Sequence, residues 1–90
     1  MAARLQSKLE AALLPTSLIV EDESHKHAGH AGAREGGETH FRIRIVSQSF
    51  AGLSRVERQR RVYAAVSEEL AERVHALSLV TLTPDEVARG

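Results

Sequence analysis

The sequence predicts an α+β fold with the element order α-β-β-α-β-α, in which helices cover one face of a three-stranded mixed sheet. Two observations predict this class. Apolar residues recur at helical spacing in two long stretches, residues 3–14 and 54–70. Residues 18–21, 41–45 and 75–82 are short apolar or alternating runs, which are typical of strands.

Length and composition limit the class of protein. The chain has 90 residues, of which 42% are hydrophobic and 27% charged, as in one small globular domain, and we expect its core over residues 3–86. The formal net charge is zero, so the whole molecule exerts no general attraction on nucleic acid. No run approaches the roughly 18 apolar residues of a membrane span, and no signal peptide is evident. We therefore expect a soluble, cytoplasmic domain that binds no membrane.

The first half of the chain is expected to form one helix, two strands and a long loop. The helix at residues 3–14 carries four leucines at helical spacing: Leu5, Leu9, Leu13 and Leu14. Pro15 ends this helix. A flexible loop rich in glycine and histidine is predicted for residues 24–38. In the strand that follows, apolar residues alternate with arginines: Phe41, Ile43 and Ile45 with Arg42 and Arg44.

The second half begins with a helix whose start is well marked. Ser54 and Glu57 form a capping box. One long helix with a buried stripe is then predicted from the spacing of Val62, Val66 and Leu70, with Tyr63 beside them. Residues 75–82 form the third strand, and a right-handed crossover places it parallel to the second. Thr83 and Pro84 start a short last helix.

The predicted loop contains three histidines within six residues, His25, His27 and His30. Imidazole is the commonest neutral metal ligand in proteins, so this cluster raises the question of metal chemistry. Two other readings stay open: the histidines are simply solvated, or they bind zinc or nickel adventitiously. The chain has no cysteine, so it cannot hold an iron–sulfur cluster alone, because such clusters take most of their ligands from thiolates.

The order and spacing of several short motifs resemble those of the BolA family, from about Leu5 to Glu86. The motifs are Asp22-Glu23-Ser24, a loop histidine, Glu38-Thr39-His40-Phe41, Val46-Ser47, Phe50 with Gly52, Arg58-x-Arg60, Val62-Tyr63, Glu68-Glu69-Leu70 and Val74-His75-Ala76-Leu77. The resemblance implies a single BolA-like domain over residues 1–90, with a fold similar to a class II KH domain. It also implies a partner, a monothiol glutaredoxin with bound glutathione, and a role in iron–sulfur cluster trafficking or iron and redox sensing.

In such complexes a 2Fe–2S cluster bridges the two proteins. The resemblance implies that the partner and glutathione supply thiolates, and that the BolA-like chain supplies two histidines. One maps to His75. The other maps to His27, or to His30 if the longer loop shifts the alignment. Two nitrogen ligands opposite two thiolates resemble Rieske ligation, which raises the reduction potential. His40 lies on the opposite face from Phe41 and is expected to be exposed or to support a ligand histidine.

The alternative function is DNA binding and transcription regulation. Six arginines are candidates for phosphate contacts: Arg55, Arg58, Arg60 and Arg61 on the second helix, and Arg42 and Arg44 on the second strand. Against it stand the zero net charge, an aromatic content of 3%, and Gly52 as the only glycine where a KH domain has a Gly-x-x-Gly loop. No motif indicates an enzyme. The free protein is expected to be a monomer or a weak dimer.

Overall fold

The first helix forms where the leucine spacing predicts it. The computed structural model describes residues 1–23 and 40–89, and its α1 (Ala2–Leu13) buries Leu5, Leu9 and Leu13 against the sheet. Leu14 was predicted to share this stripe, and that prediction was wrong: it is 78% exposed. Leu14 adopts the left-handed conformation with φ 46° at the end of the helix, which turns its side chain out of the stripe. Pro15 follows and disfavours a helical Leu14.

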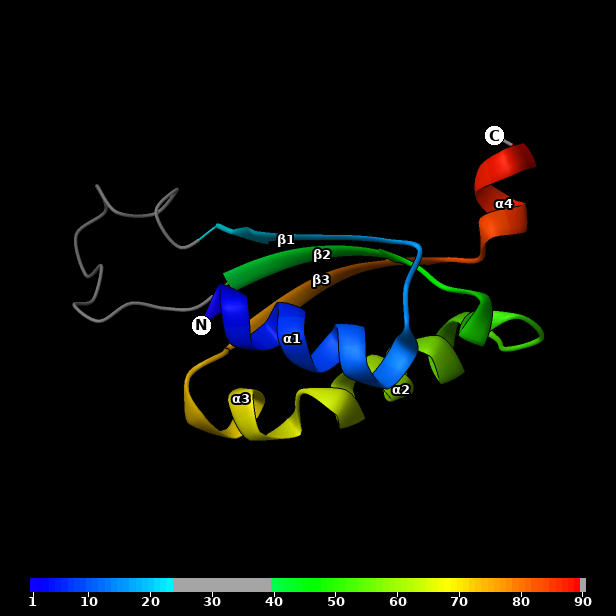
Figure 1. Ribbon diagram of the computed structural model, residues 1–90. Coiled ribbons are helices and arrows are strands. Elements are labelled where there is room, and N and C mark those ends of the chain that lie inside the picture. Colours follow the sequence, from blue (N-terminus) through cyan, green and yellow to red (C-terminus); the bar gives the residue numbers. More distant parts are fainter. Residues whose placement is uncertain (24–39, 90) are drawn as a thin grey trace.

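The sheet is mixed, as predicted. It contains β1 (Ser17–Asp22), β2 (His40–Val46) and β3 (Ala76–Leu82) in the order β1-β2-β3. β1 runs antiparallel to β2, and β2 runs parallel to β3. Because side chains alternate along a strand, the odd-numbered residues of β2 face the helices and are buried, while Arg42 lies on the other, open face. Figure 1 shows α1, α2 and α3 together on one side of the sheet.

The connection between β2 and β3 contains two helices where one was predicted. α2 (Arg55–Ala65) ends and α3 (Ser67–Glu72) begins at Val66, whose φ of −117° and ψ of 28° are not helical. The single long helix was therefore wrong, although Val66 is fully buried as its spacing predicted. The capping box at the start of α2 is confirmed. Ser54 Oγ accepts a hydrogen bond from the Glu57 N–H, and a Glu57 carboxylate oxygen accepts one from the Ser54 N–H.

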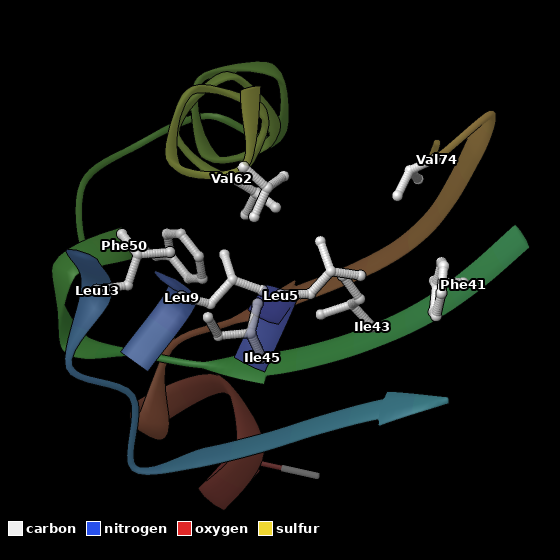
Figure 2. Packing of buried hydrophobic residues seen from close by; sticks show 10 residues of the cluster. Leu5, Leu9, Leu13, Phe41, Ile43, Ile45, Phe50, Val62 and Val74 are labelled. Atoms are coloured by element: carbon white, nitrogen blue, oxygen red, sulfur yellow. The ribbon is translucent and has the colours of Figure 1, made fainter. Parts of the chain in front are cut away.

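The core lies between the open sheet and these helices. Figure 2 shows leucines of α1 beside isoleucines of β2, with Val62 of α2 above them. The short 3₁₀ helix η2 (Gln48–Phe50) adds the fully buried Phe50. Ser47 is buried as well, and its Oγ donates to the Leu13 carbonyl over 2.6 Å, which joins the end of α1 to the end of β2.

The last helix departs from the predicted layer arrangement. α4 (Pro84–Arg89) follows β3 directly and lies at one end of the sheet, on the side away from α1, α2 and α3 (Figure 1). The prediction that helices cover one face of the sheet is confirmed for α1, α2 and α3. It does not hold for α4. None of the helices in residues 1–23 and 40–89 is long and apolar enough to cross a membrane.

Candidate functional site

One end of the sheet brings together the segments that carry the candidate ligands. β1 ends at Asp22, β2 starts at His40, and β3 starts at Ala76, which is the register partner of His40. The Glu23 N–H donates to the His40 carbonyl over 2.8 Å. Residues 23 and 40, the two ends of the described segments, are therefore neighbours at this end of the sheet. We call this end the histidine edge and define it by five residues: Asp22, Glu23, His40, His75 and Ala76.

His75 lies at the histidine edge and is exposed. The predicted strand began at His75, whereas β3 begins one residue later, so His75 lies in the short connection between α3 and β3. Val74 before it is buried in the core and anchors that connection. His40 is exposed while its neighbour Phe41 is buried, so the predicted alternation of these two side chains is confirmed.

The loop candidates His27 and His30, like His25, lie outside the described residues. Within residues 1–23 and 40–89, no group of three or more histidine, aspartate or glutamate side chains is arranged to hold a metal ion. What the structure offers at this edge is the exposed imidazole of His75, with that of His40 on the neighbouring strand. A neutral imidazole is a suitable ligand for iron, zinc or copper.

The carboxylates beside this edge are partly balanced by a strand arginine. Glu23 Oε2 lies 3.6 Å from Arg42 Nε across the open face. The side chain of Arg42 is more than half exposed, so this ion pair is weak in water. The histidine edge is thus polar and carries both signs of charge.

The six arginines proposed for phosphate contacts do not share one surface. Arg55, Arg60 and Arg61 are exposed on α2. Arg42 and Arg44 project from the open face of the sheet, which is the face that α2 does not cover. The structure therefore places the strand arginines and the helix arginines on different faces of the domain.

Arg58 is largely buried, with 12% of its side chain exposed, and its guanidinium bonds to other groups of the fold. Its Nε donates to the Leu53 carbonyl over 3.1 Å and its Nη1 to the Thr81 carbonyl over 2.9 Å. It also pairs with both carboxylate oxygens of Glu86, at 2.8 and 3.1 Å. These contacts join α2, β3 and α4.

The hydrogen bonds from Arg58, and then one from the Thr83 backbone N–H, lower the pKa of Glu86 to about 2. This structural role of Arg58 was not predicted from the sequence. The only local signal was the pair Thr83 and Glu86, which forms a second capping arrangement: the Glu86 N–H donates to Thr83 Oγ1 and the Thr83 N–H donates to Glu86 Oε1.

The fold and the histidine edge together define a small α+β domain with exposed imidazoles at the start of two neighbouring strands. The family described as BolA-like protein matches residues 9–86. The chain therefore belongs to the BolA-like protein family, as its motifs indicated.

Relatives of known name support this assignment. Protein BOLA1, chloroplastic, from Arabidopsis thaliana is 48% identical over 87 residues, covering 94% of this chain and 54% of that protein. SufE-like protein 1, chloroplastic/mitochondrial, from the same plant is 50% identical over 88 residues, covering 93% of this chain and 24% of that protein. The solved structure of BolA1 from Arabidopsis thaliana has a TM-score of 0.84 at 46% identity, covering 96% of this chain and 94% of that one.

These alignments also set limits. The chain spans about half the length of the first relative and about a quarter of the second. The names of both relatives place those proteins in organelles, and they lend no support to the cytoplasmic location expected from the sequence.

Proposed function

We propose that this domain is an adaptor, not an enzyme, that forms a heterodimer with a monothiol glutaredoxin and supplies histidine ligands to a bridging 2Fe–2S cluster. The observation that carries the proposal is the position of His75. It is exposed at the end of the sheet where residues 24–39 leave and re-enter the described region, in a chain of the BolA-like family. His27 or His30 would be the second ligand.

The residues at the histidine edge fit a shared cluster. His75 presents an imidazole at the surface, where a partner can approach, and thiolates must come from elsewhere because the chain has none. Because histidines would replace two of its thiolate ligands, the cluster would have a higher reduction potential than a cluster held by thiolates alone. The protein's own part is to present the imidazole on a rigid support: buried Val74 on one side of His75 and the hydrogen-bonded strand β3 on the other.

An anaerobic titration tests this proposal. Glutaredoxin that carries a 2Fe–2S cluster and glutathione is titrated with the domain, and visible circular dichroism follows the cluster. We expect a spectral change that saturates at a one-to-one ratio and is lost in His75→Ala. His27→Ala and His30→Ala then identify the loop ligand. Arg89→Ala is the matched control, because Arg89 is exposed on α4 at the opposite end of the sheet (Figure 1). An unchanged spectrum with the wild-type domain refutes the proposal.

DNA binding is the second candidate, and three exposed arginines of α2 favour it: Arg55, Arg60 and Arg61. Fewer arginines support DNA binding than the six predicted from the sequence. Arg58 is paired with Glu86, and Arg42 and Arg44 lie on the face of the sheet that α2 does not cover. If the cluster titration fails, duplex DNA binding that is lost when these three residues are changed to glutamine would identify this function.

A further inference from the structure

A carboxylate is fully buried between α1 and α3. Glu69 is 0% exposed, although a glutamate on a helix ordinarily faces solvent. Burial of a charge is unfavourable unless oppositely charged groups compensate it. Both compensating groups come from α1: Arg4 Nε and Lys8 Nζ lie 3.0 and 3.1 Å from Glu69 Oε2. Glu69 Oε1 has no hydrogen-bond partner among the described residues.

The main chain of the same residue ends α3. The Glu69 carbonyl accepts hydrogen bonds from the N–H groups of Arg73 and Val74, both over 3.0 Å. Val74 is buried, and the next residue is His75. Glu69 therefore connects α1 to the segment before His75. Its side chain bonds to residues of α1, and its carbonyl accepts hydrogen bonds from the two residues that precede the exposed imidazole.

Two neighbouring ion pairs lack this connection. Arg4 also bonds both carboxylate oxygens of Glu72, at 3.0 and 3.1 Å, and Lys8 pairs with Glu68. Both of these carboxylates are more than half exposed, where ion pairs contribute little. Among these three carboxylates of α3, only Glu69 is buried, and its backbone holds Val74.

We propose that Glu69 is a positioning residue for His75, and that the contact from α1 fixes the direction in which this imidazole meets a partner's cluster. The inference rests on the proposed function, in which His75 is a ligand. A ligand must be held within about 0.5 Å of its working position by the residues that support it. Loss of a supporting group around a metal ligand typically weakens binding about 10- to 100-fold.

The test compares Glu69→Gln with Glu72→Gln. The first variant keeps the volume of the buried side chain and removes its charge, while the second removes only the exposed partner of Arg4. Each is titrated with glutaredoxin carrying a 2Fe–2S cluster and glutathione, and with the same glutaredoxin free of cluster. Hydrogen exchange of the Val74 amide is measured in parallel by NMR.

We expect Glu69→Gln to bind the cluster-loaded partner about 10-fold more weakly, with unchanged affinity for the cluster-free partner and faster exchange at Val74. Glu72→Gln should match the wild type in all three. A merely structural role would lower both affinities together. If Glu69→Gln does not fold, Arg4→Gln replaces it, and its difference from Glu72→Gln reports the Arg4–Glu69 contact alone.

The possible failures are distinguishable. If the wild-type domain leaves the cluster spectrum unchanged, the proposed function is wrong and the role of Glu69 in it is wrong too. If the wild type titrates normally and Glu69→Gln titrates identically, only the positioning role is overturned. Equal losses of affinity for loaded and cluster-free partner also overturn it, since that result describes general destabilisation.

Discussion

Replacing Arg58 with methionine tests whether this arginine holds the fold together or serves a ligand. Methionine keeps an unbranched stem over the Phe50 ring, whose centroid lies 5.8 Å from the guanidinium carbon, and its helix propensity is similar to that of arginine. It removes the guanidinium donors with which Arg58 joins α2 to β3 and α4. Arg60→Met is the control, because Arg60 lies two residues away on the same helix and is exposed.

The expected loss of stability follows from the contacts of Arg58. A hydrogen bond from a charged group contributes about 1.5–3 kcal/mol, and Arg58 donates one to the Leu53 carbonyl and one to the Thr81 carbonyl. The ion pair with Glu86 adds less, because 39% of the Glu86 side chain is exposed. Water can rebind the freed carbonyls, so the lower end of the range applies. We expect the free energy of unfolding to fall by about 3 kcal/mol.

Urea denaturation followed by far-UV circular dichroism measures this change. In a thermal melt of a domain of this size, each 1 kcal/mol lost from the free energy of unfolding lowers the Tm by about 4–8 °C. A loss of about 3 kcal/mol should therefore lower the Tm of Arg58→Met by about 12 °C or more. Arg60→Met should remain within about 0.5 kcal/mol of it. If the two variants have equal stability, the guanidinium contacts do not stabilise the fold, and a ligand-binding role for Arg58 becomes the better explanation.

Three further perturbations have defined outcomes. The pKa of Glu86 is lowered in the folded state, so its contribution to stability is present at neutral pH and is lost as the pH falls from about 4.5 to about 2; Glu86→Gln should flatten the acid limb of urea midpoints measured across that range. Leu9→Ala should lower the free energy of unfolding by about 2–5 kcal/mol, because Leu9 is fully buried, whereas exposed Leu14→Ala should stay within about 0.5 kcal/mol in the same assay. Ser54→Ala should cost about 1 kcal/mol and speed amide exchange at the Glu57 N–H, and protection equal to the wild type would argue against the capping box.

The parts of the fold that depend on local patterns could be predicted from the sequence. Alternation at Phe41 and Ile43 is a property of a single strand and identifies β2 directly. The capping box at Ser54 and Glu57 involves residues three apart, so it is visible in the chain. These features need no knowledge of distant partners.

The parts that depend on distant partners could not be predicted. Glu69 is separated by 65 residues from Arg4, and without that contact a glutamate on a helix is expected to face solvent. The break at Val66 has no glycine or proline to mark it, and the buried residue of α3 is Glu69 where Leu70 was predicted. Arg58 was assigned to a basic surface because Glu86, 28 residues away, was not known to lie beside it.

The candidate site also has a part that could be predicted from the sequence and a part that could not. The place of His75 beside the third strand followed from the order of the elements, and the assignment of the chain to its family followed from its motifs. The parallel pairing of β2 with β3 was predicted from the crossover, but the register that makes His40 and Ala76 partners is seen only in the assembled sheet. Which loop histidine joins His75 stays a prediction.

The pairing of α1 with α3 has a consequence for folding during synthesis. Arg4 leaves the ribosome 65 residues before Glu69, an interval of about 3–13 s at ordinary rates of translation. Throughout that interval Arg4 lacks its carboxylate partners on α3, and β2, once it has been made, still lacks its parallel partner β3. The nascent chain therefore cannot complete its core until almost the whole domain has emerged.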